Sequence, residues 1–240
     1  MKTKLLYIGA MVVAGLTFSS CSDDFLDQTN SHQLSQDAFF DSDEAVEKNI
    51  WPLYSYVWFD FNDKFYYGMG DGRANNITAQ YSNYIYPYTN FTETSLSQGL
   101  SEAWAALYSV VDQSDNAVIN IQTKSSSNVS QTAKEQCTAE ARFMRGVAYW
   151  YIGSLWGCGV IYENPTQHVN NYVIPANPRT DVIEYAIRDL EYAAKYLPAS
   201  QTGAGRVTKY SAFGMLSRVY LTMAGLTTEG QYNGSNVQTN

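Results

Sequence analysis

The sequence has few of the residues that most often build metal centres and catalytic dyads. Its 240 residues include two histidines, His32 and His168, and three cysteines, Cys21, Cys137 and Cys158. The spacing of these residues matches no metal-ligand motif. We therefore expect the protein to bind neither a metal nor a cofactor.

Basic side chains are also scarce. There are 15 lysines and arginines against 23 aspartates and glutamates, which gives a net charge of -8 and a pI near 4.7. An acidic surface repels phosphate groups, so this composition disfavours nucleic acids and anionic lipids as partners.

Hydrolase signatures are missing as well. The sequence contains no Gly-x-Ser-x-Gly nucleophile elbow, and neither histidine lies near a nucleophile motif. The carboxylate pairs Asp23/Asp24 and Asp60/Asp63 could serve glycoside hydrolysis, which needs two carboxyl groups about 5 to 9.5 Å apart. Aspartate and glutamate are too common for such pairs to be evidence of a hydrolase. We assign no catalytic residue and keep a secreted glycoside hydrolase as a remote alternative.

Aromatic residues, by contrast, are abundant, with 20 tyrosines, 10 phenylalanines and 5 tryptophans. A tyrosine ring offers a flat apolar face and one polar tip, which suits half-exposed surfaces that stack on a ligand. Hydrophobic residues make up 45% of the chain, enough for a packed core.

Residues 1–20 are typical of a lipoprotein signal peptide. Lys2 and Lys4 form the basic region, and residues 5–18 are mostly apolar but too short to span a bilayer comfortably. Two serines then precede Cys21, which would become the lipid-bearing N-terminus. An ordinary signal peptide followed by an incidental cysteine is the alternative.

An acidic pair, Asp23 and Asp24, follows the cysteine closely and resembles the surface-export tag of Bacteroidetes-type lipoproteins. Acyl chains on Cys21 would anchor the protein firmly in a membrane. We therefore expect residues 21–40 to form a lipidated tether on the outside of the cell.

The remaining residues, 41–240, have the hydrophobic periodicity of helices. Residues 134–156 show it best, because apolar or small side chains recur there in steps of three and four. The stripe consists of Cys137, Ala141, Met144, Ala148, Ile152 and Leu155, with Phe143, Val147 and Tyr151 beside it. This helix should be buried between its neighbours. Its uncharged run is too short and too rich in glycine for a membrane span.

Other helices are expected on both sides of this central one. One starts at Asp41, which would cap it with Glu44, and is kinked by Pro52. The others cover residues 100–121, residues 181–197 with Asp181 and Glu184 as caps, and residues 208–226, and short strands are possible at 160–162 and 172–174. The pattern predicts an all-α fold of tetratricopeptide-like hairpins with long irregular loops. The polar residues 226–240 offer no terminal cap, so we expect a truncated solenoid.

Residues 59–94 lose helical periodicity and are rich in glycine, asparagine and tyrosine. Six tyrosines fall between Tyr66 and Tyr88. Rings that stack on sugars, next to side chains that bond hydroxyls, are how proteins hold neutral carbohydrate. The candidate stacking residues are Tyr81, Tyr84 and Tyr86, and the candidate hydroxyl partners are Asp71, Arg73, Asn75 and Asn76. The alternative is a loop that folds back onto its own helices. The Gly-Met-Gly-Asp-Gly run lacks the ending of a phosphate-binding loop.

Cys137 lies on the apolar stripe of the central helix, where we interpret it as a small core residue. Cys158 lies in a Trp-Gly-Cys-Gly turn. A disulfide between them is possible in an exported protein, but their spacing does not establish one.

Four blocks of sequence together resemble the SusD/RagB family of outer-membrane nutrient-binding lipoproteins. They are, in order, SDDFLD after the cysteine, AEARFMRGVAYWYIGSLWGCGV, PRTDVIEYAIRDLEYAAKYLP and GRVTKYSAFGMLSRVYL. The chain departs from the family pattern at Gly157-Cys158-Gly159 and at Pro52. Members are much longer, so the resemblance makes residues 41–240 the N-terminal helical domain of such a protein.

The resemblance implies a surface lipoprotein that captures oligosaccharide and delivers it to a TonB-dependent SusC-like transporter in the outer membrane, without cleaving it. A relative of the same fold that binds peptide or another non-sugar nutrient is the alternative. Ligand residues vary among members, so the candidate site rests on residues 71–86 alone. Arg142 and Arg145 match the family pattern, and we interpret them as scaffold ion pairs.

Overall fold

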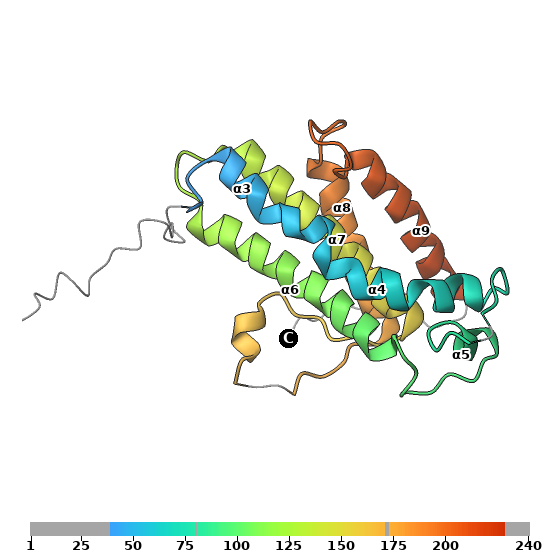
Figure 1. Ribbon diagram of the computed structural model, residues 1–240. Helices are drawn as coiled ribbons and strands as arrows, with labels where there is room; N and C mark the ends of the chain where they lie inside the picture. The colour runs from blue at the N-terminus through green and yellow to red at the C-terminus, as the bar shows by residue number, and fades with distance from the viewer. Residues whose placement is uncertain (1–38, 80, 171–172, 229–240) are drawn as a thin grey trace, which may run out of the picture. The chain divides into compact units, whose positions relative to one another are not determined.

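Figure 1 shows the computed structural model of the chain, which describes residues 39–79, 81–170 and 173–228. The predicted signal peptide, Cys21 and almost all of the tether lie outside the described residues. Within the described part, no helix combines the length and the hydropathy needed to cross a bilayer.

Four long helices dominate the fold and form successive hairpins (Figure 1). They are α6 (Leu100–Lys124), α7 (Gln131–Leu155), α8 (Arg179–Tyr196) and α9 (Lys209–Thr228). Shorter elements are α3 (Asp43–Ile50), α4 (Phe59–Lys64), α5 (Tyr86–Thr89), the π-helical turn η4 (Gly68–Gly72) and the 3-10 turns η2 (Trp51–Tyr54), η3 (Tyr56–Trp58) and η5 (Pro165–His168). Helix α7 packs against α6 on one side and α8 on the other, and α8 packs against α9. The prediction of an all-α fold of helical hairpins is confirmed.

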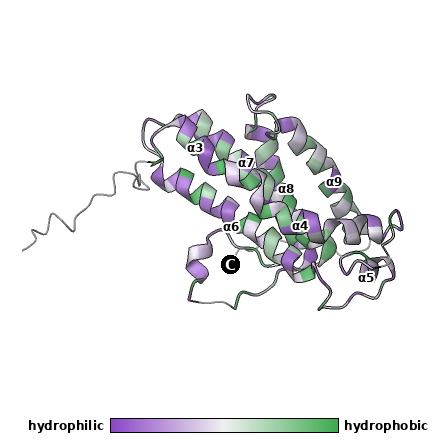
Figure 2. Cartoon of the chain, in the orientation of Figure 1, coloured by the Kyte–Doolittle hydropathy of each residue, from purple (hydrophilic) through white to green (hydrophobic). Residues whose placement is uncertain are grey.

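The central position predicted for residues 134–156 is confirmed by α7. Cys137, Ala141, Ala148 and Ile152 are at most 1% exposed, whereas Leu155 is half-buried. Figure 2 shows hydrophobic and hydrophilic residues alternating along α3 and α6, as expected for helices with one buried face.

Two glycines let α8 lie close to α7. A Cβ atom on Gly146 would lie 3.2 Å from the carbonyl oxygen of Ala186 and 3.0 Å from Leu190 Cγ. A Cβ atom on Gly153 would lie 2.8 Å from Ile183 Cδ1. The contact between the two helices therefore depends on the absence of side chains at these positions.

The predicted start of the first helix is wrong. Ser42, rather than Asp41, caps α3, and its hydroxyl accepts a hydrogen bond from the Ala45 amide at 3.2 Å. Asp41 instead accepts hydrogen bonds from Ser126 and Asn128 at 2.5 and 2.9 Å. Its carboxylate is used to hold the α6–α7 connection and is not available as a cap.

Pro52 ends the first helix instead of kinking it. The α-helix stops at Ile50, and Pro52 lies in the first turn of η2. Proline has no amide hydrogen and is well tolerated in a first helical turn, so a new short turn begins where the α-helix cannot continue.

The caps predicted for α8 are also wrong. The helix begins at Arg179, directly after Pro178, and no side chain caps it. Asp181 is a buried residue of the first turn, and Glu184 pairs with Arg188 one turn further on. Pro178 holds the extended backbone from which the helix starts, with φ -64° and ψ 158°.

The segment between α7 and α8 does not contain the strand predicted at residues 160–162. A single antiparallel bridge joins Gly159 to Asn177, with N–O distances of 3.1 and 2.7 Å. Of the second predicted strand, residue 172 lies outside the described residues, and residues 173–174 are irregular. Both cysteines of the described chain are free thiols, with Cys137 buried and Cys158 exposed.

We predict that Gly146→Val destabilises the domain by about 1–3 kcal/mol, because the new side chain meets backbone as well as side-chain atoms of α8. Thermal or urea unfolding of the purified protein measures the effect. Gly214→Ala in α9 is the control, because its Cβ meets nothing within 4 Å. That change should leave the stability equal or raise it by up to about 1 kcal/mol. Equal stabilities for wild type and Gly146→Val would show that α7 and α8 can separate at no cost.

Candidate functional site

The connection between α4 and α6 is built around Tyr88. This residue is fully buried, its ring lies edge-on to Phe65 with centroids 5.7 Å apart, and its hydroxyl donates to the Gln98 carbonyl at 3.2 Å. A Cβ atom on Gly68 would lie 2.4 Å from the Tyr84 carbonyl oxygen and 2.6 Å from the Tyr88 ring. Only glycine fits there, so η4 lies directly against α5.

The prediction that residues 59–94 lack helical structure is wrong in part. The segment contains α4, η4 and α5, which are six, five and four residues long. Elements this short have too few turns to display an apolar stripe, and they are held by buried contacts such as those of Tyr88.

Three of the predicted hydroxyl partners lie together at the end of η4. Asn76 Nδ2 donates to Asp71 Oδ1 at 3.2 Å, and the Asn76 amide donates to the Asp71 carbonyl at 2.9 Å. Asn75 between them adopts the left-handed conformation with φ 60°. All three residues are exposed. The turn therefore presents a carboxylate and two side-chain amides to the solvent.

The fourth predicted partner, Arg73, forms an ion pair with Glu93. Its guanidinium also lies 4.9 Å from the centre of the Phe91 ring. The ion pair is partly buried, with the two side chains 28% and 24% exposed. Sequence reasoning missed both partners. A usable signal existed, because Asp71 and Glu93 are the only carboxylates between residues 65 and 101.

The predicted stacking residues differ in exposure. Tyr81 is 89% exposed and Tyr86 is 47% exposed, whereas Tyr84 is half-buried. Phe91, above the guanidinium of Arg73, is 65% exposed. Tyr88 is fully buried, so the segment folds back onto its own core. The other rings named here leave aromatic surface exposed.

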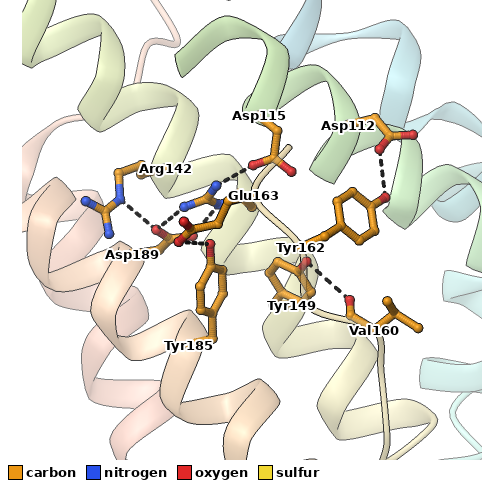
Figure 3. A network of polar contacts seen from close by, with 10 residues as sticks. Asp112, Asp115, Arg142, Tyr149, Val160, Tyr162, Glu163, Tyr185 and Asp189 are labelled. Atoms are coloured by element: carbon orange, nitrogen blue, oxygen red, sulfur yellow. Dashed lines mark hydrogen bonds and ion pairs between the residues drawn. The ribbon is translucent and has the colours of Figure 1, made fainter. Parts of the chain in front are cut away.

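A second cluster of charged residues lies inside the helical array (Figure 3). Arg145 of α7 is 4% exposed and forms ion pairs with Asp115 of α6 and Asp189 of α8. Arg142 donates from Nε to Asp189 at 2.7 Å, and its guanidinium lies 4.2 Å from the centre of the Tyr192 ring. The interpretation of the two arginines as scaffold ion pairs is confirmed.

Tyrosine hydroxyls extend this cluster to the α7–α8 connection. Tyr162 donates to Asp112 at 2.7 Å, and Tyr185 donates to Glu163 at 3.0 Å (Figure 3). Burial raises the pKa of both phenols well above the usual value, so they remain donors at every physiological pH. The cluster joins three helices and a loop. Its central carboxylates, Asp115 and Asp189, are fully buried, as expected for a structural network, while Arg142, Arg145 and Glu163 also line a cavity of about 380 Å³.

Among the described residues, no group of three or more histidines, cysteines or carboxylates could hold a metal ion. The exposed loop presents ring faces, side-chain amides and one carboxylate.

The chain matches the family model described as "starch-binding associating with outer membrane" over residues 24–221. A curated SusD-like protein of Bacteroides ovatus is 38% identical over 231 residues, which cover 96% of this chain and 41% of the relative. SusD-like protein P25 of Formosa agariphila is 22% identical over 227 residues, 88% of this chain and 42% of the relative. The chain thus spans about two fifths of the length of these curated relatives.

Solved structures also resemble this chain. A crystal structure with xylogluco-oligosaccharide is 37% identical, superposes with a TM-score of 0.67, and covers 74% of this chain and 34% of its own. A SusD homologue from Bacteroides thetaiotaomicron, 21% identical, shares the fold with a TM-score of 0.64 over 79% of this chain and 38% of its own.

We predict that Arg145→Leu costs about 3–5 kcal/mol of unfolding free energy at neutral pH, because it leaves Asp115 and Asp189 buried without their cation. Denaturant unfolding followed by circular dichroism measures this loss. Arg188→Ala is the control, since Arg188 forms an exposed i,i+4 pair with Glu184 and should cost less than about 1 kcal/mol. A cost below 1 kcal/mol for Arg145→Leu would contradict the structural role of the network.

The network should also make stability depend on pH. Burial raises the pKa of the Asp115 carboxyl to about 7, against the attraction of Arg145, and its ordinary value is 3.8. The folded state therefore binds this proton more tightly than the unfolded state does. The stabilisation that this bound proton gives to the folded state is complete below about pH 4 and is lost as the pH rises through 7. Asp115→Asn removes this titration, so its stability relative to wild type should rise between pH 5 and pH 8 in parallel urea titrations. A constant difference across this range would contradict the raised pKa.

Proposed function

This chain belongs to the SusD-like family, and we propose that it is a cell-surface lipoprotein that captures oligosaccharides and passes them to a TonB-dependent SusC-like transporter. In this proposal residues 1–20 are removed as a signal peptide, and Cys21 carries the lipid that anchors the protein to the outer membrane. Residues 21–40 act as the tether, and residues 41–240 form the N-terminal helical domain. The protein binds its ligand and does not cleave it.

The proposal for ligand binding rests on the exposed loop around η4 and α5. Tyr81 and Tyr86 expose ring faces on which a sugar can stack, and Tyr84 lies between them in sequence. Asp71, Asn75 and Asn76 offer acceptors and amide donors beside them, with Asp71 and Asn76 already held in one orientation by their mutual hydrogen bond. Groups that are ordered before a ligand arrives lose less entropy on binding.

Arg73 has a double role in this proposal. Its pair with Glu93 fixes the end of the loop, and its side chain, 28% exposed, remains a candidate partner for a sugar hydroxyl.

The relative crystallised with xylogluco-oligosaccharide supports a neutral glycan as the ligand. The net charge of -8 fits a neutral ligand, but it equally fits a cationic peptide, which is the second candidate. The two candidates differ in salt dependence, because binding of a cationic peptide weakens as salt screens the charges, whereas stacking on a neutral sugar does not.

We predict that the double change Tyr84→Ala with Tyr86→Ala weakens oligosaccharide binding by more than about 1 kcal/mol through loss of ring stacking. Isothermal titration of the full-length protein, without residues 1–20 and with Cys21 replaced by serine, against plant, host and microbial glycans measures this loss. The panel includes xylogluco-oligosaccharide and a cationic peptide. A reducing-sugar assay run on the same mixtures tests for cleavage.

Tyr56→Ala is the matched control, because this ring is 85% exposed but lies outside the loop. It should leave the affinity unchanged. Unchanged affinity in a folded Tyr84/Tyr86 variant would remove the loop from the site. Release of reducing sugar, or binding of the cationic peptide alone, would overturn glycan capture.

A further inference from the structure

A cavity of about 580 Å³ opens where η2 and the end of α3 meet the α8–α9 connection. Glu47, Trp51 and Tyr54 line one wall, and residues 202–206 line the other. Its volume falls within the range of small-molecule sites, about 300–1,000 Å³. The cavity shares no lining residue with the loop of residues 71–86.

Two residues that line the cavity, Tyr54 and Arg206, are bonded to a buried carboxylate. Glu140 of α7 is fully buried and accepts hydrogen bonds from Arg206 Nη2 at 2.5 Å and from Arg206 Nε at 3.2 Å. The Tyr54 hydroxyl also donates to Glu140 and accepts from the Val207 amide at 3.2 Å. Hydrogen bonding to Glu140 raises the pKa of Arg206 further above its ordinary value, so its guanidinium is always charged.

Arg206 keeps hydrogen-bonding capacity for a ligand. It uses Nε–H and one N–H on each terminal nitrogen, toward Glu140 and, at 3.0 Å, toward Glu47 Oε2. A guanidinium has five N–H groups, so two remain. Glu47, whose side chain is 40% exposed, uses one carboxylate oxygen for this pair and leaves the other for an incoming donor.

Trp51 supplies the apolar wall. It is the first residue of η2, and it is 53% exposed although it lines the cavity. An indole face beside fixed hydrogen-bonding groups suits a ring that is apolar on its faces and polar at its edge. Arg206 is the cation of the cluster, and Glu47 and Glu140 are its two carboxylates, so the cluster next to the cavity carries an excess of negative charge. It therefore disfavours anions.

From this geometry we propose a second carbohydrate-binding site, in which Trp51 stacks on a neutral sugar ring while Arg206 and Glu47 bond adjacent hydroxyls. The choice of a sugar as the ligand rests on the proposed function. The position of the second site does not rest on the proposed function, because the cavity is a separate surface. In Figure 1 the α8–α9 connection lies at the top of the view and α5 at the lower right. A glycan held at the loop and a glycan held at Trp51 would therefore occupy different places.

Tryptophan indole resonances in an NMR titration test this proposal on the full-length protein with Cys21 replaced by serine. The Trp51 signal is assigned from the spectrum of Trp51→Phe. The probes are xylogluco-oligosaccharide and the neutral glycans of the binding panel, with a sulfated oligosaccharide as the anionic control. We expect a saturable shift of the Trp51 signal with a neutral glycan, none with the sulfated one, and the same shift in the Tyr84/Tyr86 double variant.

Affinity at this site is compared among variants in the double-variant background, where binding at the loop is weakened. We expect Trp51→Ala to weaken binding at least about fivefold and Trp51→Phe to weaken it less, because phenylalanine keeps part of the stacking face. Phe59→Ala, which removes a ring that is 59% exposed outside the cavity, should have no effect.

The outcomes separate the two proposals. If glycan binding is abolished by the loop variant and the Trp51 signal never shifts, the second site is wrong and capture by the loop stands. A Trp51 indole that acrylamide cannot quench in the full-length protein would show that other parts of the polypeptide cover the cavity, and would also overturn the second site. If no glycan of the panel binds anywhere, both proposals are wrong.

Discussion

One buried guanidinium sets the arrangement of the central helices. Arg145 on α7 holds a carboxylate from α6 and another from α8, and all three groups are removed from water. Burying charges costs several kcal/mol for each, so the arrangement is stable only while each helix keeps its register. The neighbouring Gly146 brings α8 close enough for Asp189 to reach the arginine. Packing and electrostatics thus require the same geometry.

The long helices could be predicted from the sequence because their burial is periodic. Residues 134–156 were expected to form the central helix, and α7 covers Gln131–Leu155. The wrong predictions concern positions where a residue distant in the sequence, or the backbone, determines the local structure. Asp41 has the right chemistry for a cap, but it is bound to Ser126 and Asn128, far away in the sequence. A pattern of neighbouring residues does not show that distant residues bind the same side chain.

The same limit explains how much of the binding surfaces could be foreseen. The grouping of Asp71 with Asn76 is local, and the glycines and asparagines of the loop indicated it. The pairing of Arg73 with Glu93 depends on the loop closing around Tyr88, and its one signal in the sequence is the scarcity of carboxylates between residues 65 and 101. The cavity beside Trp51 was not foreseen at all, because Arg206 reaches it from the other end of the domain's sequence. Sequence reasoning finds a site when one segment builds it.

The bridge between Gly159 and Asn177 has a consequence for how such chains can diversify. Its two hydrogen bonds hold Gly159 and Asn177 together, while α7 and α8 are held independently by their own contacts. Residues 160–163, next to the bridge, are held by the core and by the charged network, whereas residues 164–170 further along the connection can gain, lose or exchange residues without moving either helix. Evolution could remodel this stretch between related proteins while the charged network beneath it stays the same.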